Sequence, residues 1–257
     1  MTRVLRFDHG RFSEADDAVT VEEPLEIRVN DKPVSVTLRT PGEDFDLAAG
    51  FLFTESILKS HDDIESIRHW GSPNVVRVGV RDEVTLDLQR LQRHFYSTSS
   101  CGVCGKVSID ALRVHVTPVD SEVRIADDVI AALSDKLRTS QTTFDATGSI
   151  HAAGVFDAGG TLLRIREDVG RHNAVDKVIG SYVREGAPLD GKILVVSGRT
   201  SFEIVQKALV ARVAVLAAVG APSSLAIELA REFDLTLLGF VRDGRFNVYA
   251  GERRVIS

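Results

Sequence analysis

The C-terminal third of the chain alternates between short apolar runs and segments with helical signals, and this alternation constrains the fold more than any other feature. Residues 193–196, 213–219 and 235–241 are apolar runs of the length of buried strands. Between them, Thr200-Ser-Phe-Glu203 has the pattern of a capping box that opens one helix, and residues 223–231 favour a second helix. Strand, helix, strand, helix, strand with short connections predicts a parallel sheet covered by helices, so we expect an α/β fold.

The N-terminal part has a different pattern. Residues 25–29 and 34–38 alternate between apolar and polar across the turn formers Asn30 and Asp31, which predicts a hairpin with one buried face. Segment 46–58 is apolar enough for a buried helix, and a second hairpin is expected within 75–88. The expected organisation is a smaller α+β part with β-hairpins over 1–95, a mobile loop with two cysteines over 96–110, and an α/β core domain over 111–257.

The charge balance and the hydropathy pattern exclude several classes of protein. The 257 residues include 31 Lys and Arg against 37 Asp and Glu, a net charge of −6 that argues against wrapping nucleic acid or coating an anionic membrane. The longest apolar run, 213–219, is far shorter than the roughly 20 residues of a membrane span, and the first residues lack the pattern of a secretory signal. We therefore expect a cytoplasmic protein that binds anions only through local basic groups.

The two cysteines of the chain lie three positions apart in Ser100-Cys-Gly-Val-Cys-Gly-Lys106. In a reducing compartment such a pair favours chemistry or metal binding over a structural disulfide. A neighbouring Lys, a second thiol and the backbone N–H groups of a Gly-rich loop all favour the reactive thiolate. Three interpretations stay open for Cys101 and Cys104: a reactive or sulfur-carrying thiol pair, a metal site completed by His or carboxylate, or no function. A four-cysteine zinc site is excluded, because the chain has no third cysteine.

Polar groups also gather where strands and helices are expected to meet. Ser197-Gly-Arg-Thr-Ser201 lies between an apolar run and a helix, where helix N–H groups and Arg199 could hold a phosphate. Residues 166–177 carry eight ionisable or amide side chains in twelve positions, Arg171 and His172 among them, which favours the lining of a site. His151 enters an expected strand among small neighbours that leave room for a ligand. The chain has neither a Walker A nor a G-x-G-x-x-G pattern, which excludes the usual mononucleotide loops.

The stretch Phe240-Val-Arg-Asp-Gly-Arg245 ends the last apolar run. Its Asp-Gly pair is a hairpin signal. Its two arginines also stand at the carboxyl end of a strand, which is where ligands usually bind in α/β sheets.

Taken together, these segments resemble the FdhD family of formate dehydrogenase accessory sulfurtransferases. The resemblance covers the chain from about residue 19 to residue 257, while the first eighteen residues match nothing firm. Its most specific carriers are SCGVCG at 100–105, TGSIHAAGVF at 147–156, REDVGRHNAVDKVIG at 166–180, SGRTSFEIVQKA at 197–208, APSSLAIELA at 221–230 and GFVRDGR at 239–245.

The resemblance implies a function. Proteins of this family accept sulfur from a cysteine desulfurase as a persulfide and pass it to the bis-guanylated molybdenum cofactor before that cofactor enters formate dehydrogenase. By position, Cys101 would carry the persulfide and Cys104 would be its partner. The cofactor would be a bound substrate, with no permanent cofactor and no metal. The resemblance further implies a cytidine deaminase-like central sheet flanked by helices, and a homodimer. The stretch assigned to cofactor binding corresponds to Phe240, Val241, Arg242, Asp243, Gly244 and Arg245. From their positions at helix starts and strand ends, we expect Arg199, Arg171, Arg242 and Arg245 to hold the pyrophosphates and guanines of the cofactor, with His172 as a further binding residue.

Two other functions compete with this one. A zinc-dependent deaminase would order its motif as H-x-E followed by P-C-x-x-C. Here His151 follows the cysteines, Ala153 stands where the Glu is required, and Ser100 replaces the Pro, so the general acid/base is missing. The second alternative is a chaperone that binds the cofactor and docks on formate dehydrogenase without sulfur chemistry.

Overall fold

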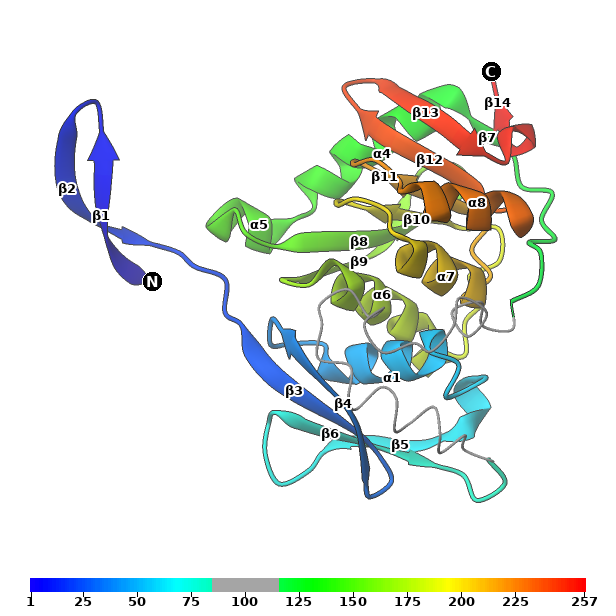
Figure 1. Cartoon of the computed structure of the whole chain (residues 1–257), viewed down its shortest axis with the longest axis horizontal. Helices are drawn as coiled ribbons and strands as arrows, with labels where there is room; N and C mark the ends of the chain where they lie inside the picture. Colours follow the sequence, from blue (N-terminus) through cyan, green and yellow to red (C-terminus); the bar gives the residue numbers. More distant parts are fainter. Residues whose placement is uncertain (85–115) are drawn as a thin grey trace.

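The largest part of the molecule is a six-stranded sheet with the strand order β13-β12-β11-β10-β8-β9. The computed structural model describes residues 1–84 and 116–257 (Figure 1). The three apolar runs of the C-terminal third form the neighbouring parallel strands β10, β11 and β12, as predicted. The strands are β8 (His151–Phe156), β9 (Leu162–Asp168), β10 (Ile193–Val196), β11 (Val215–Ala218), β12 (Thr236–Arg242) and β13 (Arg245–Ala250).

The prediction of a parallel sheet is correct only for these three central strands. β8 is antiparallel to both β10 and β9, and β13 is antiparallel to β12, so the sheet is mixed. For β8–β9 and β12–β13 the physical reason is the length of the connection, because a short turn can join only antiparallel neighbours. At Asp243 and Gly244 both φ angles are positive, 55° and 69°, which is typical of the two-residue hairpin turn between β12 and β13.

Helices cover both faces of this sheet. Helix α4 (Asp127–Thr139) contacts strands from β9 to β13 on one face, while α6 (Arg171–Glu185), α7 (Phe202–Val210) and α8 (Ser224–Glu232) lie on the other (Figure 1). The short helix α5 (Thr142–Thr147) follows α4 beside the start of β8. The result is a mixed α/β architecture with its main apolar core on the two faces of the sheet. The likeness to the cytidine deaminase fold stays an expectation of the resemblance.

A second, four-stranded sheet with the order β4-β3-β6-β5 packs on helix α1 (Asp44–Thr54). The predicted hairpin of the N-terminal part is present as β3 and β4, whereas β6 lies between β3 and β5. Residues 85–88, which the sequence placed in a hairpin with β6, lie outside the described residues, as does the whole of the expected cysteine loop at 96–110. The strands are β3 (Glu23–Val29), β4 (Lys32–Arg39), β5 (Ile64–His69) and β6 (Val75–Val80); η1 (His61–Asp63) precedes β5.

Two glycines let the N-terminal part pack against the main body. Helix α1 lies along α6, with Gly50 and Gly180 at the crossing (Figure 1). A Cβ atom on Gly50 would stand 1.8 Å from the carbonyl oxygen of Asp176, and one on Gly180 would stand 1.9 Å from that of Asp46. The two helix backbones therefore touch, and no larger residue fits at either position without separating them.

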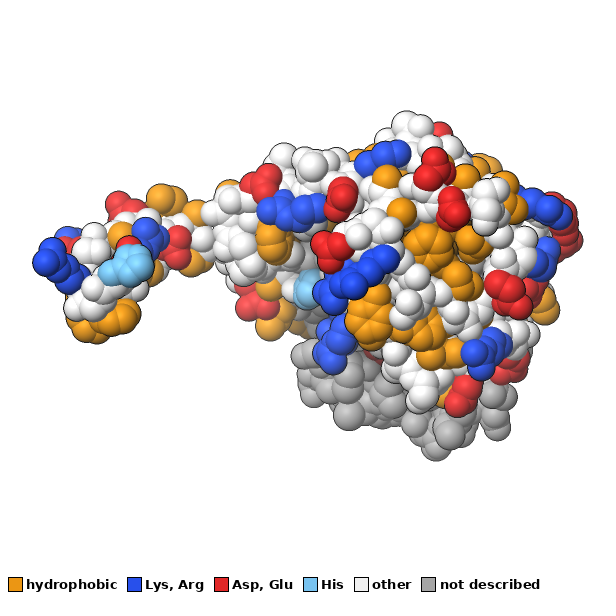
Figure 2. Space-filling model, turned by 90° about the horizontal axis from the view of Figure 1, so that it is seen from above, with side chains coloured by type: hydrophobic (Ala, Val, Ile, Leu, Met, Phe, Trp, Pro, Cys, Tyr) orange, Lys and Arg blue, Asp and Glu red, His pale blue; other side chains and the backbone are white. Residues whose placement is uncertain are grey.

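The first residues form a projecting hairpin, for which the sequence analysis assigned no element. Strands β1 (Thr2–Asp8) and β2 (Arg11–Asp17) pair antiparallel and extend away from the body (Figures 1 and 2). The side chain of Thr20 anchors its base, at 2.9 Å from the hydroxyl of Thr147 and 2.7 Å from that of Ser149. Near the other end of the chain, β14 (Val255–Ile256) follows η2 (Glu252–Arg254) and pairs with β7 (Ile125–Ala126).

Within the two described ranges, none of the helices is both long and apolar enough to cross a bilayer.

Candidate functional site

The loops that leave the carboxyl ends of β10, β11 and β12 are joined to one another by backbone hydrogen bonds. Gly220 N–H donates to the carbonyl oxygen of Gly198 at 3.1 Å, and Phe240 N–H donates to that of Gly220 at 3.1 Å. A Cβ on Gly220 would lie 2.9 Å from the Gly198 oxygen, so only glycine allows this approach. The three loops therefore form one edge, to which Arg199 and Arg242 belong.

The predicted capping box at the start of α7 is wrong. The N-cap residue is Ser201, and its side chain accepts no backbone hydrogen bond. Instead, the Nε2 atom of His172 lies 3.3 Å from the Ser201 hydroxyl and 3.1 Å from a carboxylate oxygen of Glu203. The hydroxyl of Thr200 is buried and has no hydrogen-bond partner among the described residues. Contact with His172, which comes from another helix, takes the place of the local cap at the start of α7.

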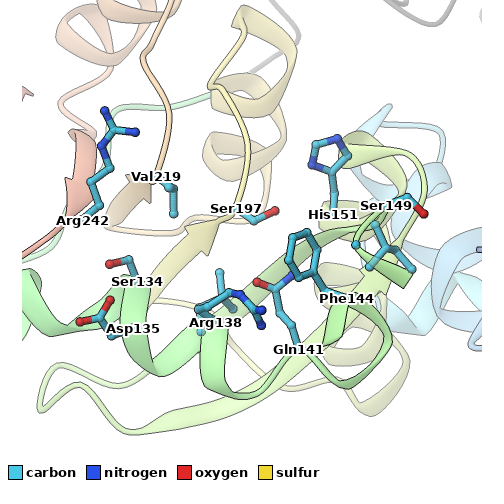
Figure 3. A pocket seen from close by; sticks show the side chains of 13 residues that line it. Ser134, Asp135, Arg138, Gln141, Phe144, Ser149, His151, Ser197, Val219 and Arg242 are labelled. Carbon is cyan, nitrogen blue, oxygen red and sulfur yellow. The ribbon is translucent and has the colours of Figure 1, made fainter. Parts of the chain in front are cut away.

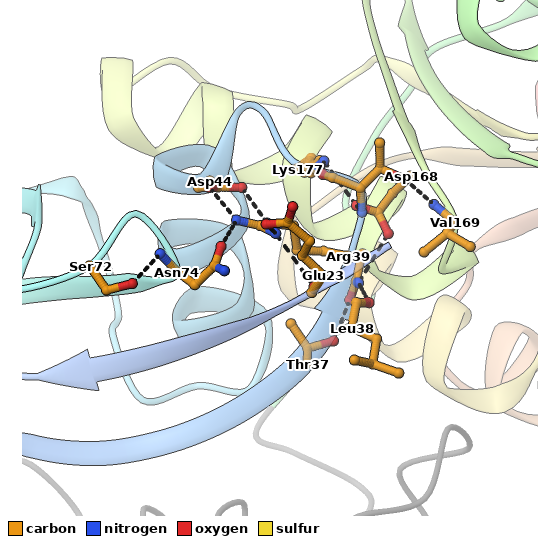
Figure 4. A network of polar contacts seen from close by, with 12 residues as sticks. Glu23, Thr37, Leu38, Arg39, Asp44, Ser72, Asn74, Asp168, Val169 and Lys177 are labelled. Atoms are coloured by element: carbon orange, nitrogen blue, oxygen red, sulfur yellow. Dashed lines mark hydrogen bonds and ion pairs between the residues drawn. The ribbon is translucent and has the colours of Figure 1, made fainter. Parts of the chain in front are cut away.

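The turn that carries Arg171 and His172 is held by Asp168, which is fully buried at the end of β9. Its carboxylate accepts hydrogen bonds from the backbone N–H of Gly170 at 2.8 Å and of Thr40 at 3.1 Å, and it pairs with the Lys177 ammonium at 2.9 Å (Figure 4). Lys177 also donates to the carbonyl oxygen of Thr40. One buried ion pair therefore joins strand β9 to helix α6, and Thr40, directly after β4, hydrogen-bonds to both of its partners.

His151, the first residue of β8, faces this same edge. A Cβ on Gly198 would stand 3.5 Å from His151 Nδ1 and 3.8 Å from the Cδ of Arg171. Burial lowers the pKa of His151 below its usual 6.5, and the positive charges of Arg171 and His172 lower it further. His151 is therefore mostly a neutral imidazole at pH 7, and it lies beside the guanidinium group of Arg171.

A cavity of about 590 Å³ extends from His151 between helix α4 and the sheet (Figure 3). Arg242 lies at one end with Ser134 and Asp135, and Phe144, Gln141 and His151 lie toward the other (Figure 3). Its size is within the range of small-molecule sites, and it lies at the carboxyl edge of the parallel strands, where such sites are common.

The structure brings together four of the residues that the sequence assigned to the site. Arg171, His172 and Arg199 belong to the helix starts at the edge, and Arg242 lines the cavity. Phe240 lies beside Arg242, with its ring centroid 5.6 Å from the guanidinium. Asp243, Gly244 and Arg245 form the exposed turn, and Val241 is a core residue with 0% exposure, so its side chain is not available to a ligand. Cys101 and Cys104 lie outside the described residues.

No sequence motif indicated the side chains that α4 and the residues after it contribute to the cavity. Ser134 and Gln141 are 5% and 3% exposed, and the Ser134 hydroxyl and the Gln141 amide nitrogen have no hydrogen-bond partner among the described residues. Buried polar atoms in folded proteins are nearly always hydrogen-bonded, so these two atoms are suited to a ligand. A polar residue on an amphipathic helix gives no such signal in the sequence, because it resembles a solvated face.

The comparisons with known proteins assign the chain to a family. The model of the FdhD/NarQ family matches residues 20–256. The chain is 48% identical to the "Sulfur carrier protein FdhD" of Streptomyces avermitilis, over 98% of this chain and 94% of that protein. It is 45% identical to the protein of the same name from Mycolicibacterium paratuberculosis, over 98% and 97% of the two chains. The chain therefore belongs to the FdhD/NarQ family, as the sequence motifs indicated.

A solved structure shares the fold. The crystal structure from Desulfotalea psychrophila, named for a formate dehydrogenase accessory protein, aligns with a TM-score of 0.81 over 100% of this chain and 98% of that one. The two sequences are 24% identical, so this likeness shows the fold alone.

Proposed function

We propose that this protein is a sulfur carrier for formate dehydrogenase maturation, which accepts sulfur from a cysteine desulfurase and transfers it to the bis-guanylated molybdenum cofactor. The observation that carries the proposal is the near full-length identity of 45–48% to relatives named sulfur carriers, in a chain whose two cysteines stand as Cys101-x-x-Cys104.

The chemistry is a thiol–disulfide type exchange. The Cys101 thiolate attacks the outer sulfur of the donor's persulfide, the donor's S–S bond breaks, and the donor cysteine leaves as a thiolate. The chain then holds the sulfur as a persulfide until the acceptor takes it. The thiol of Cys104 can attack this persulfide in turn, so the Cys104→Ala variant tests whether sulfur transfer requires Cys104.

The edge of the six-stranded sheet supports the binding of an anionic nucleotide. Arg171, Arg199 and Arg242 provide guanidinium groups that suit phosphate oxygens, and Ser201, the N-cap of α7, makes no side-chain cap hydrogen bond among the described residues. The cavity beside them has room for one nucleotide portion of the cofactor. We assign the pyrophosphate of the cofactor to this edge.

The test of the sulfur-carrying step is intact-protein mass spectrometry after incubation with a cysteine desulfurase and cysteine, without reductant. The expected result is a gain of one sulfur mass on the wild type that reductant removes and that Cys101→Ala abolishes. Cys104→Ala is the matched control for loss of one thiol in the same loop. Retention of the full mass gain in Cys101→Ala would contradict the assignment of the carrier residue.

The chaperone alternative is separated by a second measurement. Cells that lack the native protein and express Cys101→Ala should have inactive formate dehydrogenase if sulfur transfer is required. Active formate dehydrogenase in those cells, with no sulfur on any form of the protein, would favour a cofactor-binding chaperone without sulfur chemistry.

A further inference from the structure

The exposed apolar side chains of this protein are concentrated near its N-terminus. Of the thirteen large apolar side chains that are exposed in the described part of the chain, eight lie within the first 38 residues: Met1, Leu5, Phe7, Phe12, Val19, Val21, Val36 and Leu38. Single apolar side chains are normal on a protein surface, whereas a concentration of this kind marks an interaction surface. Three of the eight lie on the hairpin of β1 and β2, and two lie on strand β4.

One face of the hairpin is both apolar and acidic. Residues that pair across two antiparallel strands lie on the same face. Phe7 therefore stands beside Phe12, with ring centroids 5.0 Å apart. Leu5 stands beside Glu14 on the same face, and Asp16 points the same way two residues further along β2. A two-stranded hairpin is at best marginally stable in water unless another element covers it, so this face calls for a partner.

The rest of the same chain does not provide this partner. Strands β1 and β2 make their extensive contacts with each other, and the hairpin extends away from the rest of the chain (Figures 1 and 2). Its charges also argue against two kinds of partner, because residues 2–17 carry four carboxylates against three arginines. Such a balance gives no attraction to a nucleic acid or to an anionic membrane. The covering surface therefore belongs to another protein molecule.

The four-stranded sheet has an outer face, on the side away from α1, with an apolar strip at one edge. Every second residue of β3 packs toward α1, and the residues between them, Glu26 and Arg28, point to the outer face. Val36 pairs with Glu26, which places Val36 on the outer face together with Leu38, two residues further along β4. Val36 and Leu38 are 57% and 55% exposed, so the sheet presents apolar side chains where polar ones are usual.

Arginines cross the same outer face in a row. Arg28 of β3 pairs with Arg77 of β6, and Arg77 pairs with Arg68 of β5. The exposed ring of Trp70 lies against the first two, with its centroid 5.0 and 5.2 Å from their guanidinium carbons. Arg28 and Arg77 also pair with carboxylates of the same chain, whereas Arg68 is exposed and makes no ion pair or hydrogen bond with any described residue. Like charges directly opposite one another weaken a sheet, so this row favours a partner that brings carboxylates.

The hairpin and the outer face match each other in charge and in apolar character. We propose that two copies of this chain exchange their N-terminal hairpins, so that each hairpin lies on the outer face of the other copy's four-stranded sheet. Phe7 and Phe12 pack on Val36 and Leu38 of the second copy, and the carboxylates of the hairpin face the arginine row. Each copy gives one hairpin and receives one, and both contacts contribute to the roughly 800 Å² per partner that a specific interface buries. The hairpin precedes the residues that the family model matches, so this contact goes beyond the homodimer that the family resemblance implies.

The first measurement is sedimentation velocity of the full chain at concentrations from about 1 to about 100 μM. The wild type should show a monomer–dimer equilibrium that added salt weakens, because part of the contact is ionic. Phe7→Ser combined with Phe12→Ser should weaken the dimer by about tenfold or more, since two rings of each hairpin lose their apolar contact. Leu163→Ser is the matched control: Leu163 is 45% exposed on β9, outside both surfaces, and its variant should associate like the wild type.

A mixture of two variants distinguishes exchange from contact between two hairpins. A chain without residues 2–17 keeps the outer face and has no hairpin. Val36→Asp combined with Arg68→Glu keeps the hairpin and changes the outer face. Each variant alone should be monomeric. The mixture should form a one-to-one complex at the upper concentrations, because a hairpin of the second variant can lie on the intact outer face of the first.

Three outcomes would overturn the inference. A wild type that stays monomeric at every concentration would show that the two surfaces do not meet. A dimer of unchanged affinity without residues 2–17 would show that another surface joins the copies. A mixture that forms no complex, although circular dichroism shows both variants to be folded, would show that the hairpin does not bind the outer face. None of these outcomes bears on the sulfur-carrying step, which the mass measurement on Cys101 tests separately.

Discussion

At the scale of single residues, the site depends on side chains whose charge is set by their neighbours. His151 is kept neutral by burial and by the nearby Arg171 and His172, while Asp168 is held by two backbone N–H groups and Lys177. If the proposed phosphate binds there, its negative charge would stabilise the protonated form of His151 and raise the pKa of the imidazole.

The pH dependence of nucleotide binding follows from this arrangement. The pKa of His151 lies below 6.5, so the imidazole gains its proton only as the pH falls below that value, and an anion then binds more tightly. Lowering the pH from 7.5 to 5.5 should strengthen GDP binding by about threefold more in the wild type than in His151→Gln. Calorimetric titration at both pH values measures this, and the titration of GDP itself is common to the two proteins. Parallel pH profiles would contradict the role of His151.

The lowered pKa of His151 has the opposite effect on the stability of the fold, which decreases as the pH falls. Because the unfolded chain binds a proton at His151 more readily than the folded chain does, stability falls as the pH drops below about 6.5. Binding should therefore be compared only at pH values where circular dichroism shows the folded protein.

At the scale of elements, the crossing of α1 and α6 joins the N-terminal sheet to the body that carries the site. Gly50 and Gly180 let the two backbones touch, and the buried ion pair of Lys207 with Asp176, at 2.9 Å, links α7 to the same crossing. The start of α6 carries Arg171 and His172, so a shift of this helix would move two candidate ligands of the phosphate.

Gly180→Ala should therefore destabilise the protein by about 3 kcal/mol, because its methyl group would meet the carbonyl oxygen of Asp46 and force the helices apart. Urea unfolding followed by circular dichroism measures the change. Gly159→Ala is the matched control, since the nearest atom to its methyl group is 3.4 Å away and its φ is not positive. A decrease of less than about 1 kcal/mol in the free energy of unfolding of Gly180→Ala would contradict the importance of this close helix contact.

At the scale of the whole molecule, the N-terminal hairpin of β1 and β2 projects from the rest of the protein and leaves apolar side chains exposed. Leu5, Phe7 and Phe12 are each more than 60% exposed, and β1 and β2 project beside the region of α5 (Figures 1 and 2). The predicted homodimer stays a prediction, and these exposed side chains provide apolar surface available to a partner.

Removal of residues 2–17 should leave the rest of the protein folded, because the hydrogen bond of Thr20 remains. In addition, the extensive contacts of β1 and β2 are with each other. In dilute solution, where the copies are separate, the melting temperature should change by no more than about 2 °C. Differential scanning calorimetry, with light scattering on the same samples, measures both stability and association. A larger fall in melting temperature in dilute solution would show that the hairpin of β1 and β2 covers apolar surface of the rest of the chain, whereas a fall only at high concentration would show that it covers that of a second copy.

Local patterns in the sequence were sufficient for most elements and for part of the site. The apolar runs of 193–196, 213–219 and 235–241 predicted three strands, because continuous burial leaves a signal in consecutive residues. The Asp-Gly pair predicted the turn between β12 and β13 for the same reason. The motifs around Arg171, Arg199 and Arg242 predicted candidate ligands, and the motifs of the whole chain predicted its family.

The sequence by itself therefore determined the alternation of elements, the family and the basic residues of the site. Only the tertiary structure decided what surrounds them. The sequence predicted a capping box at Thr200 to Glu203, but the approach of His172 from another helix redirected Ser201 and Glu203. The cavity, and the buried Ser134 hydroxyl that has no hydrogen-bond partner among the described residues, arise where α4 crosses the sheet. A local pattern reports which face of an element is buried; the partner on that face is set by segments far away in the chain.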